Sequence, residues 1–159
     1  MKRLTVFGAL LLSVAICGFA LATDTDNHQV TVQVTAINEV GITGGNITLT
    51  INTATAGSQP TDAVDNTTCD LAWSTNQSSK KITVQTSLGS PTFALKVAAQ
   101  NVSGGTAGSE VTVSTSAQDF VSSISTTVGS CDLQYTASAT LSDGTGSDVH
   151  TITYTMTDS

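Results

Sequence analysis

Apolar and polar residues alternate along most of the chain that follows the first two dozen positions. Two stretches show the pattern most clearly, Cys69–Trp73 (Cys-Asp-Leu-Ala-Trp) and Cys131–Tyr135 (Cys-Asp-Leu-Gln-Tyr). In both, the large apolar side chains stand at every second position, and successive side chains of a strand point to opposite faces. Each stretch is therefore predicted to be a strand that buries its cysteine, leucine and aromatic side chain on one face.

The same period of two predicts further strands, separated by turns rich in Gly and Asn. Their apolar positions fall in 30–36, 40–42, 47–51, 82–84, 93–97, 111–113 and 150–156. Residues 117–124 fit a helical turn as well as a strand. Residues that favour helices are scarce, whereas Thr, Ser, Val and Ile abound. We therefore predict an all-β fold, an antiparallel β-sandwich of immunoglobulin-like or jelly-roll type with about eight or nine short strands.

The N-terminus has the pattern of a secretory signal peptide. Lys2 and Arg3 precede the apolar run Leu4–Phe19, and Ala20-Leu21-Ala22 follows as a cleavage site. We predict that residues 1–22 are removed and that residues 23–159 form a single secreted domain, extracellular or at the cell surface. A retained membrane anchor is the alternative, but the run is shorter than the ~20 residues that span a bilayer. Lipidation of Cys17 is a further alternative, which a preceding Ile disfavours.

Cleavage at that site would leave two cysteines, Cys69 and Cys131. An even number of cysteines in an exported protein predicts a disulfide, here Cys69–Cys131. The alternative is a pair of free or metal-binding thiols. The chain has no Cys-x-x-Cys motif and only two histidines, so no cofactor is expected.

The charge balance excludes several partners. The chain has twelve acidic and five basic residues, a net charge of −7, and the signal peptide holds two of the basic ones. Nucleic acid and anionic membrane surfaces would repel the mature protein. We expect contact with a membrane only during export.

Candidate catalytic residues are few, and we expect no enzyme activity. His28 and His150 are the histidines, and neither a Gly-x-Ser-x-Gly nor a His-Glu-x-x-His motif is present. Most acidic residues fall in predicted turns. Asp143 and Asp148 are weak candidates for calcium ligands, as are Asp24, Asp26 and Asn27. The alternative is that Asp and Gly simply form turns.

Two further features concern carbohydrate. Trp73 is in phase with Cys69 and Leu71, so we expect it to be buried rather than to present a sugar-binding platform. Four asparagines begin Asn-x-Ser/Thr sequons near predicted turns and are candidates for glycosylation. They are Asn46, Asn66, Asn76 and Asn101.

The signal peptide, the Thr- and Ser-rich alternation, the predicted disulfide and the terminal run Ile152–Met156 together resemble small secreted surface proteins of prokaryotes. The chain is similar in style to the pilin-like β-sandwich group, which includes fimbrial subunits, spore-coat-U-type pilins and TasA-like filament subunits. The resemblance implies a non-catalytic subunit of an extracellular filament or surface layer that assembles with copies of itself. The other hypothesis is a monomeric exported domain that binds a glycan or calcium.

The resemblance also implies a way of assembling. Val30, Val32, Val34 and Ala36 alternate with polar residues after a polar leader, as a donor strand would. Residues 23–37 could leave their own domain and add a strand to a neighbour. The alternative is that residues 29–37 form the first strand of their own sandwich.

Overall fold

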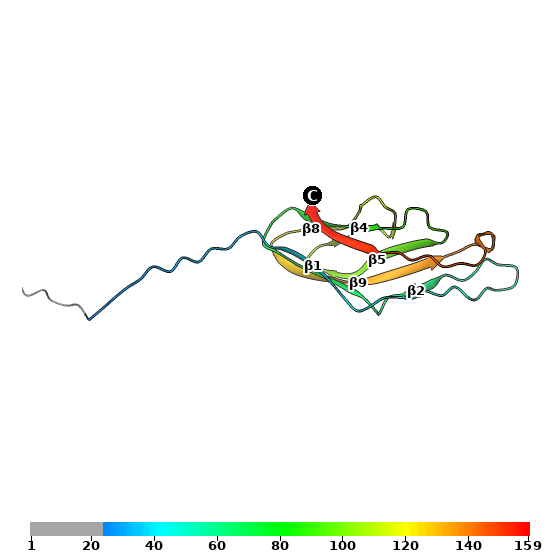
Figure 1. The fold of residues 1–159 in the computed structure, drawn as a ribbon, viewed down its shortest axis with the longest axis horizontal. Coiled ribbons are helices and arrows are strands. Elements are labelled where there is room, and N and C mark those ends of the chain that lie inside the picture. Colours follow the sequence, from blue (N-terminus) through cyan, green and yellow to red (C-terminus); the bar gives the residue numbers. More distant parts are fainter. Residues whose placement is uncertain (1–23) are drawn as a thin grey trace, which may run out of the picture. The chain divides into compact units, whose positions relative to one another are not determined.

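The computed structural model describes residues 24–159 (Figure 1). The predicted signal peptide, residues 1–22, and Cys17 lie outside these described residues. The chain divides into two units, residues 1–33 and 34–159. Of the first unit the structure describes residues 24–33, which contain neither helix nor strand.

The second unit is all-β, as predicted, and consists of two antiparallel sheets. One sheet has the order β1-β3-β9-β5-β7, with β2 pairing with β9 as well. Its strands are β1 (Asn38–Thr43), β2 (Ala63–Asp65), β3 (Asp70–Thr75), β5 (Ala94–Ser103), β7 (Val111–Thr112) and β9 (Thr127–Ser138). The other has the order β10-β4-β8-β6. Its strands are β4 (Lys80–Thr86), β6 (Thr106–Ala107), β8 (Gln118–Ile124) and β10 (Ile152–Asp158). A single 3-10 turn, η1 (Leu141–Asp143), interrupts the connection to β10.

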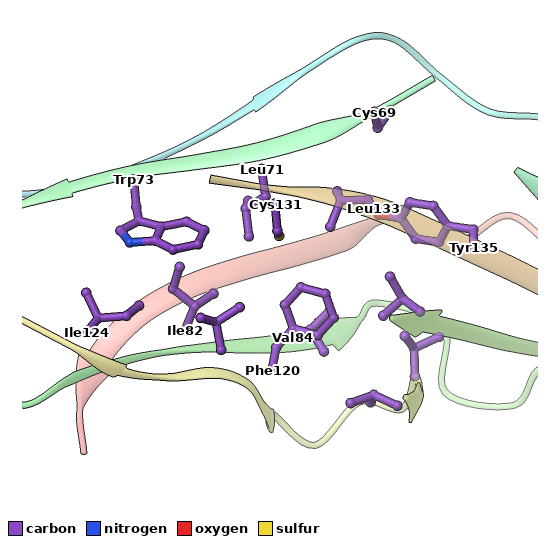
Figure 2. Packing of buried hydrophobic residues seen from close by; sticks show 14 residues of the cluster. Cys69, Leu71, Trp73, Ile82, Val84, Phe120, Ile124, Cys131, Leu133 and Tyr135 are labelled. Carbon is purple, nitrogen blue, oxygen red and sulfur yellow. The ribbon is translucent and has the colours of Figure 1, made fainter. Parts of the chain in front are cut away.

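The core lies between the two sheets (Figure 2). The two Cys-Asp-Leu stretches become neighbouring strands, with Leu71 opposite Cys131 in the ladder of β3 and β9. Their apolar faces point inward, as predicted, and Trp73 is only 3% exposed. Side chains from β4 and β8 cover them from the second sheet, namely Ile82, Val84, Phe120, Val121 and Ile124.

Gly129 makes room for the tryptophan ring in this core. It lies opposite Trp73 in the ladder, and a Cβ atom added to it would come within 2.3 Å of Trp73 Cε2. Trp73 Nε1 is buried without a hydrogen-bond partner among the described residues. Packing alone therefore positions the ring.

Two of the predicted strands are wrong. Residues 29–37 belong to no strand, because the first strand begins at Asn38, and residues 46–51 are likewise outside both sheets. Alternation identifies an extended segment with one apolar face, but it does not supply a hydrogen-bonding neighbour. The ambiguous stretch 117–124 is resolved as strand β8. Within residues 24–159, no helix is long and apolar enough to cross a membrane.

Candidate assembly surface

The apolar side chains of the N-terminal segment, residues 28–37, are largely exposed to solvent. Val30 is 72% exposed, Val32 84% and Val34 73%, and Ala36 is exposed as well. Val84, Val97 and Val121, which lie on strands of the core, are completely buried. The segment thus has the alternation of a strand with one buried face, while that face is not buried.

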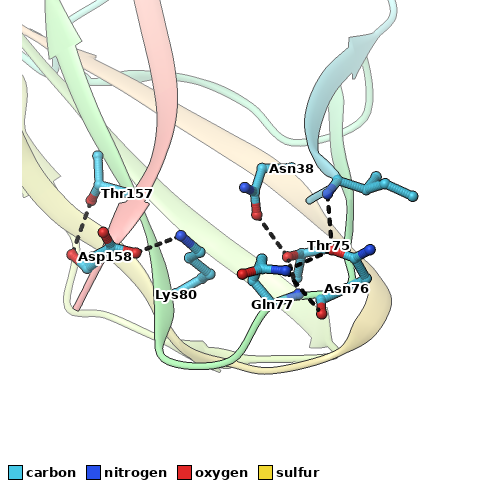
Figure 3. Close-up of polar contacts among 8 residues, drawn as sticks. Asn38, Thr75, Asn76, Gln77, Lys80, Thr157 and Asp158 are labelled. Atoms are coloured by element: carbon cyan, nitrogen blue, oxygen red, sulfur yellow. Dashed lines mark hydrogen bonds and ion pairs between the residues drawn. The ribbon is translucent and has the colours of Figure 1, made fainter. Parts of the chain in front are cut away.

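The C-terminal end of this segment, residues 35–37, is its root, and it is fixed by Asn76 in the turn between β3 and β4 (Figure 3). The backbone N–H of Ile37 donates to Asn76 Oδ1 over 2.8 Å, and Asn76 Nδ2 donates to the carbonyl of Thr35 over 2.8 Å. Asn76 N–H donates in turn to the carbonyl of Ile37. Thr75 Oγ1 donates to Asn38 Oδ1 over 2.8 Å. These bonds hold residues 35–38 extended at one end of β3.

An open hollow of about 360 Å³ lies beside this root. It is lined by Ile37, residues 74–76 and residues 126–128. Ile37 is 43% exposed and Val128 is 74% exposed, so apolar surface continues from the root onto β9. Exposed apolar surface of this kind is typical of contact sites.

The sandwich is less completely covered on the side where β1 and β10, one edge strand from each sheet, contact each other. Neither strand contributes a fully buried apolar side chain, whereas β3, β4, β8 and β9 contribute most of them. The apolar residues of β1 and β10 are only partly buried against the core. They include Val40, Ile152, Tyr154 and Met156. At the C-terminal end of β10, Lys80 of β4 forms an ion pair with Asp158 (Figure 3).

Tyr154 joins β10 to the core through its ring and its hydroxyl group. Its ring lies 5.2 Å from that of Phe120, and its hydroxyl is 2.9 Å from the hydroxyl of Tyr135. Burial raises the pKa of Tyr154 well above its usual value, and the neighbouring Tyr135 adds to the effect. Burial also raises the pKa of Tyr135. Both phenols therefore stay neutral throughout the physiological range.

The predicted disulfide is not formed in the structure, where Cys69 and Cys131 are buried free thiols. The N–H of Leu133 donates to the carbonyl of Cys69, and Cys131 faces Leu71, so the cysteines are diagonal neighbours on one face. Diagonal Cα atoms are about 7–8 Å apart, whereas bridged ones are usually within about 6.8 Å. Cys69 Sγ instead donates to the carbonyl of Gly45 over 3.2 Å. The alternation in the sequence predicts that both cysteines lie on the same face of the sheet. It does not predict that they are diagonal neighbours rather than directly opposite each other.

Burial raises the pKa of Cys131 to about 11, and the carboxylates of Asp132 and Asp70 contribute further. These two acids stand opposite each other in the ladder of β3 and β9. The thiolate is the reactive form of cysteine, so Cys131 is almost entirely unreactive at neutral pH in the folded protein.

The calcium candidates Asp143 and Asp148 bind backbone groups separately. Asp148 Oδ2 accepts from the N–H groups of Thr92 and Phe93 at 2.7 and 2.8 Å, which ties the approach to β10 to the approach to β5. Asp143 Oδ2 accepts from the N–H of Thr140 over 2.7 Å and caps η1. Within residues 24–159, no three His, Cys, Asp or Glu side chains gather as metal ligands would.

His150 lies beside a threonine, His28 is exposed to solvent and Trp73 lies in the core. His150 Nδ1 is 3.1 Å from Thr86 Oγ1, and Asp148, two residues away, is engaged with backbone amides. His28 is exposed in the N-terminal segment. The burial of Trp73 leaves its ring out of reach of a sugar.

Three of the four sequon asparagines are exposed, namely Asn46, Asn66 and Asn101. Asn101 Nδ2 donates to Asp132 Oδ2 over 2.6 Å. Asn76 is the exception, because its side-chain amide holds the root of the N-terminal segment. Modification of Asn76 would break these bonds. Sequence reasoning found this residue only as a sequon, and nothing in its local pattern indicates the contact with residues 35–37.

Comparison of the chain with family models, with curated proteins and with solved structures finds no match. Two features of the molecule itself point towards function, the exposed apolar N-terminal segment and the partly covered side of the sandwich.

Proposed function

We propose that the mature chain is a non-catalytic structural subunit of an extracellular filament or surface layer. Each copy is an exported β-sandwich of immunoglobulin-like or jelly-roll type, in the manner of pilin-like subunits. Copies join when the N-terminal segment of one copy adds to a sheet of the next by donor-strand complementation. The observation that carries the proposal is the exposure of Val30, Val32 and Val34 at alternate positions outside both sheets.

Burial of these three side chains in a neighbouring copy would favour association. Fully burying a valine stabilises a complex by roughly 1.5–3 kcal/mol, so the three together offer roughly 5–9 kcal/mol. Association costs an estimated 4–15 kcal/mol in lost freedom of motion. Apolar burial alone therefore leaves a weak complex, and backbone hydrogen bonds along an added strand supply the remainder.

The composition of the segment is consistent with this role. Residues 28–37 contain no Asp, Glu, Lys or Arg, although the chain as a whole is strongly acidic. An acidic segment would be repelled by an acidic neighbour, and a segment of either charge would have to lose hydration on burial. A solvated linker has no need of this restriction.

The test replaces Val32, the most exposed of the three valines, with aspartate in the full-length precursor, and the exported protein is collected. Val149→Asp is the matched control, because Val149 is 79% exposed and also lies outside the strands. We expect the wild type and Val149→Asp to form ordered fibres in negative-stain electron microscopy. Val32→Asp should remain monomeric in sedimentation while melting at the temperature of the wild-type monomer.

Two outcomes would contradict the proposal. One is a wild-type protein that stays strictly monomeric at high concentration. The other is a Val32→Asp variant that polymerises as readily as the wild type. A variant that polymerises less but also unfolds would be replaced by Val32→Thr, which keeps the β-branched shape and lowers only the apolar character.

The alternative function, a monomeric exported domain that binds a glycan or calcium, has less support from the molecule. A glycan platform would need an exposed aromatic ring, and Trp73 is buried. Calcium would need converging oxygen ligands, and Asp143 and Asp148 are each engaged by other backbone groups. Binding to a glycan array by a strictly monomeric wild type would favour this alternative.

We also propose that the exported subunit carries the Cys69–Cys131 disulfide. Both thiols face the same side of neighbouring strands, so a small local shift of the ladder would bring them together. Burial of both thiols and the raised pKa of Cys131 disfavour oxidation after folding, so we expect an oxidant in the export compartment to form the bond before folding is complete. Mass spectrometry after alkylation without reductant should show the exported protein lighter by two hydrogens and unalkylated. Alkylation of both cysteines only after unfolding, with no reductant added, would show that they are free.

A further inference from the structure

Residues 46–52 are extended but unpaired. Their apolar side chains alternate, with Ile47, Leu49 and Ile51 partly buried and the polar residues between them exposed. Ile47 and Leu49 pack against the core. Within the described chain, no backbone hydrogen bond involves any residue from 46 to 52. An extended segment with one side packed and its backbone groups free is a template for another strand.

The two ends of this segment are fixed, so the free stretch is defined by the fold. At one end, Gly44 has a φ of +100°, and a Cβ atom there would lie 2.0 Å from the carbonyl oxygen of Thr68. At the other end, Ala54 forms a bridge with Pro60. After Pro60 the chain continues into β2, which pairs with β9 and with no other described strand (Figure 1). Strand β2 thus has an unpaired edge as well.

Charge distinguishes this segment from the edge strands β1 and β10. Strand β1 carries the exposed Glu39, and β10 ends in Asp158. Residues 46–52 contain no charged side chain, and neither do residues 28–37. An uncharged strand that added to a charged edge would desolvate the charge without supplying a partner for it, whereas the uncharged segment 46–52 avoids this cost. Seven extended residues cover about 23 Å, and the ten residues from 28 to 37 are long enough to pair along all of it.

We propose that residues 46–52 are the acceptor at which the N-terminal segment of a second copy adds as a strand. This inference rests on the proposed function and names its docking site. The side chains of Val30, Val32 and Val34 from the incoming copy continue the partly buried row of Ile47, Leu49 and Ile51. The backbone groups of residues 46–52 gain hydrogen bonds that no backbone group among residues 24–159 supplies.

The test is disulfide trapping between exposed polar positions. Gln33→Cys, in the N-terminal segment, is combined in one chain with Thr48→Cys or with Thr50→Cys, and Thr31→Cys replaces Gln33→Cys to cover the neighbouring register. The matched control combines the same segment cysteines with Thr155→Cys, which is exposed on β10, the competing edge. Cys69 and Cys131 are buried and remain as they are. Exported protein is oxidised, run on non-reducing gels, and the bonded pairs are mapped by mass spectrometry.

We expect ladders of covalent oligomers with Thr48→Cys or Thr50→Cys, no ladder with Thr155→Cys, and loss of the ladder when Val32→Asp is added. A ladder through Thr155→Cys alone would overturn the acceptor and leave the proposed function standing. So would fibres that form without any cross-link to residue 48 or 50. A bridge within one chain, running as a monomer, would show that the segment covers its own domain and would overturn the acceptor. Fibres formed by Val32→Asp without cross-linking would instead overturn the proposed function.

Discussion

Replacing Gly129 with alanine should destabilise the sandwich strongly, although alanine is the smallest side chain that can be added. The new Cβ would lie 2.3 Å from Trp73 Cε2, 2.4 Å from Trp73 Nε1 and 2.5 Å from the carbonyl oxygen of Ser103. Two of these atoms belong to a ring that is 3% exposed, and the third is backbone of the adjacent strand β5. Neither the ring of Trp73 nor the backbone of β5 can move without disturbing the core.

The magnitude follows from these contacts. Overpacking a core typically costs about 1–3 kcal/mol, and a clash on both a buried ring and the backbone places Gly129→Ala near the upper end. For a domain of this size, 1 kcal/mol lowers the melting temperature by roughly 3–4 °C. We therefore expect the melting temperature to fall by roughly 10 °C.

The assays are thermal melting and urea unfolding of the exported protein. Both are followed by the fluorescence of Trp73, the only tryptophan. Gly41→Ala in β1 is the matched control, because a Cβ atom at Gly41 would meet nothing within 4 Å. The control should be as stable as the wild type or slightly more stable, since glycine weakens a strand. If Gly129→Ala unfolds at the wild-type urea concentration with an unchanged Trp73 spectrum, the proposed packing of the ring on Gly129 is wrong.

Two further predictions concern Tyr154 on the edge strand β10 and Asn76 at the root of the N-terminal segment. Because the folded-state pKa of Tyr154 is raised, the folded protein keeps a proton that the unfolded chain releases above about pH 10; wild-type stability should therefore fall as the pH rises from about 10. Tyr154→Phe should be about 1 kcal/mol less stable than the wild type at pH 8, because it loses the hydrogen bond to Tyr135. Between pH 8 and pH 11 the variant should lose less stability than the wild type, as urea unfolding at the two pH values would measure. Equal losses of stability in the two proteins would contradict this reasoning. Asn76→Ala removes two side-chain hydrogen bonds worth about 0.5–1.5 kcal/mol each. Amide hydrogen exchange at Ile37 should therefore accelerate by roughly tenfold or more. The control variant Asn66→Ala should leave this exchange rate unchanged. Equal protection of Ile37 in both variants would show that Asn76 does not hold the segment.

Sequence alone determined the features that depend on local pattern. The alternation in Cys69–Trp73 and Cys131–Tyr135 identified two strands and the face that each buries, and the structure confirms both. The all-β class and the burial of Trp73 followed from the same period of two. These predictions succeed because side-chain direction in a strand is fixed by the backbone itself, whatever lies next to it.

Tertiary structure decided what each extended segment lies beside. The segments 29–37 and 46–51 have the same alternation as the core strands, yet neither pairs with a strand in the described part of the chain. The ladder of β3 and β9 places Cys69 diagonal to Cys131, and the turn after β3 brings Asn76 to Ile37. Pairing and register depend on contacts between residues far apart in the chain, and a period of two is the same whichever partner a strand finds.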